Sequence, residues 1–137
     1  MLTRTVAAAT LFVLPLAACG GDSASGGSDV ANADLQVHAK DSLTFDKKEY
    51  TVHGGDISIA YIDDGSLQHT LLVDGHGPFK LSVNGKQSKT GTINLAPGTY
   101  TLYCDVPTHR EAGMQATLTV TAAPASGSGG SSSASGN

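Results

Sequence analysis

Four side chains with metal-binding chemistry are spread in a regular order along this 137-residue chain. Cys104, His109 and Met114 have the spacing Cys-x4-His-x4-Met, and His69 lies 35 residues before the cysteine. A thiolate, two imidazoles and a thioether form the ligand set of a blue (type 1) copper site, in which the thioether is the weak axial ligand. The soft sulfurs suit Cu(I) and the imidazoles suit both oxidation states. The set therefore predicts one copper ion that exchanges single electrons.

Three of these residues share one turn-rich loop, residues 104–114, between two expected strands. Rigid strands at its two ends allow the side chains of such a short loop to converge on one point. Pro107 stiffens the loop, and Gly113 permits the bend that turns Met114 inward. His69, at the start of another expected strand, must complete the set from a neighbouring part of the sheet.

The elements that must hold this loop are short strands. Apolar and polar residues alternate in several runs, and turn residues separate these runs. In the last run Ala116, Leu118 and Val120 share one face. No stretch keeps a helical period for ten residues, so we expect an all-β sandwich or small barrel of seven to eight strands. The expected strands cover residues 35–39, 50–52, 57–62, 69–73, 92–95, 100–103 and 115–121, and turns are indicated at 63–65, 75–78, 84–85 and 97–98.

The residues around the loop resemble the C-terminal copper motif of the cupredoxins, the family that includes plastocyanin and azurin. The resemblance covers most of residues 34–121 and implies a Greek-key β-sandwich with copper at one end. It also implies electron transfer rather than an enzymatic reaction, and each of the four candidate ligands matches a ligand position of the family. The residues that match the C-terminal motif are Leu95 to Tyr100, Tyr103-Cys104, Pro107, His109 and Ala112-Gly113-Met114. Those that match the upstream half of the family pattern are Gly54-Gly55-Asp56, Ile57-Ser58-Ile59 and Gln68-His69-Thr70.

The chain departs from the family motif at two places. Thr108 stands where many relatives have glycine before the loop histidine, and Gln115-Ala116 stands where a small glycine often follows the methionine. Thr70 and Asp105, each directly after a ligand, match positions where relatives often connect the two ligand strands by a side-chain hydrogen bond. Such bonds orient metal ligands and tune the metal.

Three other uses of these residues stay open on the sequence alone. His69, Cys104 and His109 are a possible zinc site, although a methionine is a poor ligand for zinc. Cys104 and Cys19 are the only two cysteines, and in an oxidising compartment they are a possible disulfide. A single methionine at a strand end is also common as core filler.

Residues 1–18 have the features of an export signal, with Arg4 at the charged start and an apolar stretch over residues 6–17. Leu16-Ala17-Ala18-Cys19 resembles the lipoprotein box of bacteria. This resemblance implies cleavage before Cys19 and acylation of its thiol, by palmitate for example, and of its new amino group. Several acyl chains give a stable membrane anchor. An ordinary cleaved leader followed by a chance cysteine is the alternative.

The segments on either side of the domain are rich in glycine and serine. Residues 19–33 are expected to be a flexible tether, and residues 123–137 a disordered tail, because such composition buries too little apolar surface to fold. The cupredoxin domain is then residues 34–122. The chain carries a formal charge of −4, which argues against a nucleic-acid partner, and no apolar run reaches the length of a membrane-spanning helix.

Together these features predict a monomeric copper protein on the extracytoplasmic face of the cell membrane, either at the cell surface or on the periplasmic side. It is expected to carry electrons between redox proteins of the cell envelope, with His69 buried and His109 more exposed. Around His109, a partner-docking surface is expected from Pro107, Arg110, Glu111 and Ala112, although Arg110 and Glu111 are equally well explained as soluble loop residues. Copper storage or delivery to an oxidase is the main alternative, and a metal-free contact module is a third. An oxidase is disfavoured because one domain offers no second copper cluster.

Overall fold

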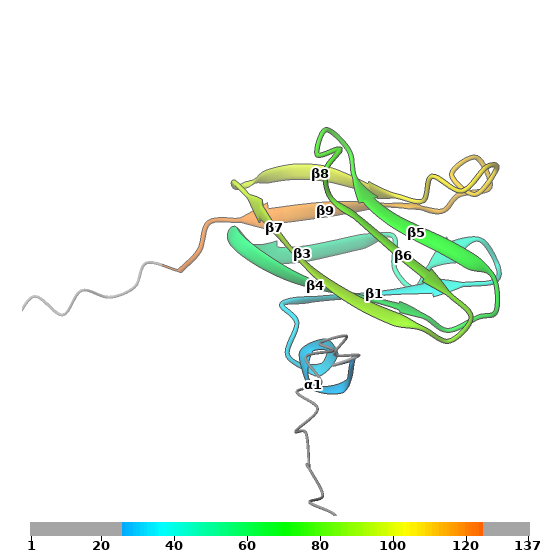
Figure 1. Ribbon diagram of the computed structural model, residues 1–137. Coiled ribbons are helices and arrows are strands. Elements are labelled where there is room, and N and C mark those ends of the chain that lie inside the picture. Colours follow the sequence, from blue (N-terminus) through cyan, green and yellow to red (C-terminus); the bar gives the residue numbers. More distant parts are fainter. Residues whose placement is uncertain (1–25, 125–137) are drawn as a thin grey trace, which may run out of the picture.

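The computed structural model describes residues 26–124, which form one short helix and nine strands (Figure 1). The helix is α1 (Gly26–Ala31). The strands are β1 (Leu35–Lys40), β2 (Thr44–Phe45), β3 (Glu49–His53), β4 (Gly55–Asp63), β5 (Gln68–Val73), β6 (Lys80–Asn84), β7 (Ser88–Leu95), β8 (Gly98–Tyr103) and β9 (Gln115–Thr121).

The strands form two sheets that pack face to face. One sheet has the order β2-β1-β4-β7 and the other the order β3-β9-β8-β5-β6. Neighbouring strands are antiparallel except for the pairs β1–β4 and β3–β9, which are parallel. The predicted all-β Greek-key sandwich is therefore confirmed.

The core lies between the two sheets, where alternate residues of each strand point inward. Ile57, Ile59 and Tyr61 of β4 are buried, and β9 contributes Ala116, Leu118 and Val120, as their alternation predicts. Burial of each large side chain contributes roughly 1.5–3 kcal/mol to folding. The Tyr61 hydroxyl also donates a hydrogen bond to the Thr70 carbonyl oxygen at 3.1 Å. This bond ties β4 of one sheet to β5 of the other, one residue from His69.

Two strands, β2 and β6, were not predicted, and β7 begins four residues earlier than expected. The start of β7 was missed because its first half has no large apolar residue. The side chains there are exposed or only partly buried in the structure. Gly91 allows β6 to pack closely there, since a Cβ atom at this position would lie 2.9 Å from Leu81 Cδ2. Asn84-Gly85 does form a turn, with a φ of 52° at Gly85, and it carries the chain from one sheet to the other.

The expectation of an unstructured tether over residues 19–33 is wrong for Gly26–Ala31, which form α1. Asn32 Nδ2 donates a hydrogen bond to the Ser28 carbonyl oxygen (2.7 Å), and Gln36 Nε2 donates one to that of Val30 (3.2 Å). These side chains satisfy carbonyl groups that a helix end leaves free. The helix packs against β4 and β7 (Figure 1). Composition alone carries no signal of such contacts.

The predicted signal peptide, Cys19 and nearly all of the predicted C-terminal tail lie outside the described residues. Within residues 26–124, no helix has the length and apolarity that crossing a membrane requires.

Candidate metal centre

Three neighbouring strands bring the candidate ligands to one end of the second sheet. His69 is the second residue of β5, Cys104 directly follows β8, and Met114 directly precedes β9. β8 lies between β9 and β5 and is antiparallel to both, and its last residue, Tyr103, pairs with Gln115 at the start of β9 and with Leu72 near the end of β5. The chain that follows β8 therefore runs alongside the first residues of β5. The loop that closes β8 onto β9 therefore lies beside the start of β5 (Figure 1).

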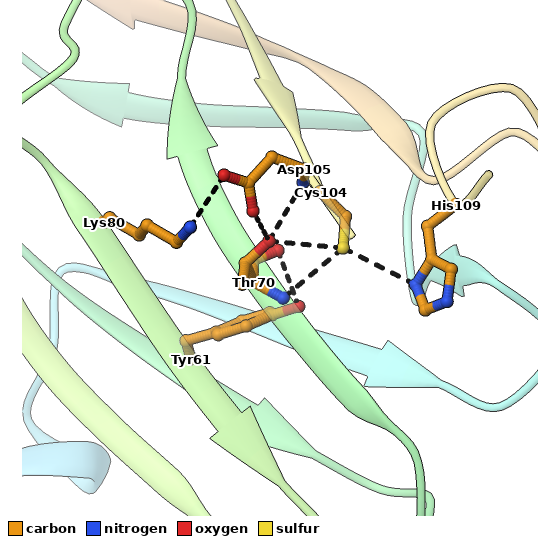
Figure 2. Close-up of polar contacts among 6 residues, drawn as sticks. All are labelled: Tyr61, Thr70, Lys80, Cys104, Asp105 and His109. Carbon is orange, nitrogen blue, oxygen red and sulfur yellow. Dashed lines mark hydrogen bonds and ion pairs between the residues drawn. The ribbon is translucent and has the colours of Figure 1, made fainter. Parts of the chain in front are cut away.

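The structure brings His69, Cys104 and His109 into one buried cluster. One ligand atom from each residue lies within 4.8 Å of those from the other two. Cys104 Sγ is 3.6 Å from His109 Nδ1 (Figure 2). The ring centroids of His69 and His109 are 5.1 Å apart. His69 and Cys104 have no solvent exposure, whereas His109 is 9% exposed, in the expected order for the two histidines.

Backbone hydrogen bonds fold the 104–114 loop back on itself and place Met114. The Cys104 N–H donates to the Met114 carbonyl oxygen at 3.1 Å, and the Met114 N–H donates to that of His109 at 2.9 Å. Gly113 has a φ of 109°, a conformation that favours glycine, and its carbonyl oxygen accepts a hydrogen bond from Lys48 Nζ at 2.7 Å. The Met114 side chain is fully buried as a result.

The residue chemistry of this cluster fits copper. Both ring nitrogens of His69 are buried without a hydrogen-bond partner, a costly arrangement unless a metal binds one of them. Burial lowers the pKa of His69, which favours the neutral imidazole that metal binding needs. Two imidazoles with a thiolate and a thioether are the donor set of type 1 copper. Zinc would leave the soft thioether unused.

The two residues that follow ligands, Thr70 and Asp105, contact each other and Cys104 (Figure 2). Thr70 Oγ1 donates to Asp105 Oδ1 at 2.7 Å and accepts from the Asp105 N–H at 2.9 Å. The Thr70 N–H donates to Cys104 Sγ at 3.4 Å, and Oγ1 lies 3.3 Å from the same sulfur. Thr70 therefore connects the strand of His69 to the thiol and to the residue after it.

Lys80 extends this network, although no sequence motif singles it out. Its Nζ lies 2.7 Å from Asp105 Oδ2 (Figure 2). The hydrogen bond from Lys80, supported by the one from Thr70, holds the pKa of Asp105 below its usual value. Lys80 belongs to the unpredicted strand β6, so only the register of β6 against β5 could have indicated the contact.

We expect Thr70→Val to destabilise the metal-free protein by about 1–3 kcal/mol. The variant keeps the side-chain shape, but it leaves the Asp105 N–H without its acceptor and removes the hydroxyl that contacts the sulfur. Chemical denaturation measures the free energy of unfolding. Thr119→Val, at an exposed position of β9, is the matched control and should change it by less than about 0.5 kcal/mol. Equal effects of the two variants would show that the Thr70–Asp105 contact contributes nothing.

Thr108, one of the two departures from the family motif, occupies a strained conformation. Its φ is 72°, a left-handed value that a β-branched residue rarely adopts and that glycine adopts freely. Its carbonyl oxygen accepts a hydrogen bond from the Ala112 N–H at 3.0 Å, so the loop keeps its turn despite the strain. The departure therefore places a strained residue directly before His109, in a turn that is nevertheless hydrogen-bonded.

The four predicted docking residues lie on the same loop as His109 and are all exposed: Pro107, Arg110, Glu111 and Ala112. The Arg110 side chain is exposed, but two contacts restrict the position of its guanidinium group. Its guanidinium lies 4.3 Å from the centroid of the Tyr103 ring and 3.6 Å from an Asp74 carboxylate oxygen. These contacts hold the cation against the body of the domain.

Comparisons with known proteins place these observations in a wider context. Residues 31–121 match the family model described as copper binding proteins, plastocyanin/azurin family. No curated protein sequence matches the chain. The fold is similar to that of dithionite-reduced auracyanin from the photosynthetic bacterium Roseiflexus castenholzii, with 24% identity, a TM-score of 0.57, and coverage of 66% of this chain and 96% of that one. It is also similar to an azurin (Az-iso2) from Methylomonas sp. strain J, with 13% identity, a TM-score of 0.55, and coverage of 65% and 98%.

Proposed function

This chain belongs to the plastocyanin/azurin family of copper-binding proteins, and on that premise we propose that it is a lipid-anchored carrier of single electrons at the cell envelope. The observation that carries the proposal is the buried cluster of His69, Cys104 and His109, with Met114 buried at the end of the loop that holds Cys104 and His109. Bound copper supplies a one-electron Cu(II)/Cu(I) couple.

The protein's part is to hold the ligands still. Cys104 provides the thiolate, which loses its proton on metal binding, and the two imidazoles complete the strong donors. The hydrogen bonds within the 104–114 loop and the bond from Lys48 restrain the positions of the donors. A restrained site changes little in geometry between oxidation states, and this favours fast electron exchange over release of the metal.

His109 supplies the route to a partner. It is the one strong ligand with measurable exposure, and Pro107 and Ala112 lie exposed on the same loop. The Arg110 guanidinium is held by Tyr103 and Asp74, so this cation does not lie free over the small apolar area that a second protein would contact. A transient interface of limited area suits redox partners that must separate after each transfer.

Electron exchange between two copies of the protein tests this surface without a known partner. We expect Ala112→Lys to lower the electron self-exchange rate constant about tenfold. Each of the two copies then carries an added positive charge on its contact surface, and the two charges repel. Thr119→Lys is the matched control, because Thr119 of β9 pairs with Thr99, at the end of β8 that lies away from Cys104. It should leave the rate constant nearly unchanged. NMR line broadening in mixtures of oxidised and reduced protein measures the rate. Equal slowing by the two variants would contradict docking at this loop.

The membrane anchor is tested separately through Cys19. We propose that the full chain, produced in a bacterium, is found in the membrane fraction, because acyl chains on Cys19 bind the bilayer. Cys19→Ser should move the protein to the soluble fraction and leave the visible spectrum of its copper unchanged. If the variant and the parent chain divide equally between the fractions, the anchor assignment is wrong.

A further inference from the structure

Three buried side-chain nitrogen or oxygen atoms lack a hydrogen-bond partner in residues 26–124, and they belong to only two residues. They are Nδ1 and Nε2 of His69 and Oδ2 of Asp63. Asp63, the last residue of β4, is 2% exposed, and His69 has no exposure. A carboxylate oxygen of Asp63 and a ring nitrogen of His69 lie within 4.8 Å of each other.

Copper binding accounts for only one of the two ring nitrogens. In a neutral imidazole that binds a metal, the other nitrogen carries the proton and needs an acceptor. We propose that Asp63 is this acceptor, so that its carboxylate fixes the orientation and tautomer of the His69 ring and lowers the reduction potential of the copper. A small rotation of the ring or one bridging water completes the contact over the observed separation.

The neighbouring carboxylate of Asp41 is a weaker candidate, although it also lies near His69. It is exposed, and its oxygens already accept hydrogen bonds from the Ser66 N–H (2.8 Å), the Leu67 N–H (3.1 Å) and the Ser66 hydroxyl (3.0 Å). Asp63 differs, because only its Oδ1 is used, as acceptor of the Gly65 N–H at 2.8 Å. Oδ2 of Asp63 is therefore the free acceptor.

The fold holds Asp63 at this place. Its N–H donates to the Gln87 carbonyl oxygen at 2.8 Å, which fixes the end of β4. Two residues earlier, the Tyr61 hydroxyl donates to the Thr70 carbonyl oxygen at 3.1 Å, which fixes β4 against the start of β5 (Figure 2). The backbone positions of Asp63 and His69 are thus coupled through a short, hydrogen-bonded path between the two sheets.

The charge of Asp63 has an electrical consequence at the metal. A negative charge favours Cu(II) over Cu(I), and the effect is strong where burial limits screening by solvent. This inference rests on the proposed copper function, and it makes Asp63 a positioning residue that acts through His69.

The test compares Asp63→Asn with Asp64→Asn in the otherwise unchanged chain. Both changes remove one negative charge, but the Asp64 side chain is 47% exposed and pairs with His38 Nδ1 at 3.0 Å. In the copper-loaded protein, Asp63→Asn should shift the ratio of Cu(II) to Cu(I) affinity about tenfold toward Cu(I), a rise of about 59 mV in reduction potential. Asp64→Asn should shift the ratio less than twofold. Equal shifts would overturn the electrostatic role.

The second readout is ¹⁵N NMR of the His69 ring in the metal-free protein. We expect one tautomer in the parent chain and in Asp64→Asn, and a mixed or reversed tautomer in Asp63→Asn, whose amide cannot replace both acceptor oxygens. Asp63→Ser serves if Asp63→Asn fails to fold. An unchanged tautomer in the Asp63 variant would overturn the proposal.

A second metal ion per chain, bound by the parent and lost in both Asp41→Asn and Asp63→Asn, would also overturn it. The group of Asp41, Asp63 and His69 would then be a cation site. A parent chain that binds no copper would refute the proposed function, and the metal-free NMR result would still decide the contact.

Discussion

Cys104→Ser is expected to give a folded protein that has lost the intense visible band of the copper-loaded parent. It should also bind Cu(II) at least about a hundredfold more weakly. Cys104 is the only thiol in the cluster, and its Sγ lies 3.6 Å from His109 Nδ1. A serine hydroxyl is a harder donor, and it does not ionise readily near neutral pH. Absorption spectroscopy during Cu(II) addition and competition with a chelator measure the two effects.

Thr119→Ser is the control for this change, because it alters an exposed side chain of β9 that lies away from the loop. It should keep both the band and the affinity. A Cys104→Ser protein that still turns blue would show that another group provides the charge-transfer donor. A parent protein that stays colourless and takes up zinc stoichiometrically would favour the zinc alternative.

The second large effect is an asymmetry between the two histidines. His109→Gly should leave a slot open to solvent, because the His109 ring is the partly exposed one, at 9%. External imidazole at millimolar concentration is therefore expected to enter the slot and restore the visible band. Absorption titration with imidazole, in the presence of Cu(II), measures the recovery.

His69→Gly should respond differently, because His69 lies fully buried within β5. Loss of this side chain leaves a closed cavity and a glycine inside a strand, so we expect the metal-free protein to lose about 2–4 kcal/mol of stability. Chemical denaturation of the two variants gives the comparison. Equal stability losses with equal rescue by imidazole would contradict the assignment of His69 as the buried ligand and His109 as the exposed one.

Much of the site was predictable because its information is local. The spacing from Cys104 to Met114 lies within one loop, and a loop between paired strands can bring its residues to one point. The strand patterns that frame it, such as the alternation in β9, are equally local. His69 was predictable because it lies near the start of a strand whose flanking turn signals and apolar run are clear. These patterns sufficed for the fold class and for the copper ligand set.

The missed features depend on contacts between segments far apart in the sequence. Lys80 reaches Asp105 only because β6 pairs with β5, and β6 has just two large apolar residues to mark it. Asp63 has the residue type of an ordinary turn aspartate, and its burial next to His69 follows from the packing of β4 on β5. The stacking of Arg110 on Tyr103 likewise depends on the observed loop path.

The helix α1 shows the limit of reasoning from composition. Glycine and serine dominate the segment, so a flexible chain was the reasonable prediction. The side chains of Asn32 and Gln36 nevertheless donate hydrogen bonds to carbonyl oxygens of the helix. The helix also packs against β4 and β7. One consequence is that helical structure lies against the sheet before residue 34, within the segment where a tether was predicted.

The most direct test of a type 1 copper electron carrier is a spectroelectrochemical titration of the copper-loaded protein in the presence of a Cu(I) chelator. We predict that one electron per copper removes the visible band, that reoxidation restores it fully, and that the chelator gains no copper over repeated cycles. Loss of copper to the chelator on reduction would contradict electron carriage and favour copper delivery. Absence of any visible band with Cu(II) bound would contradict the type 1 centre itself.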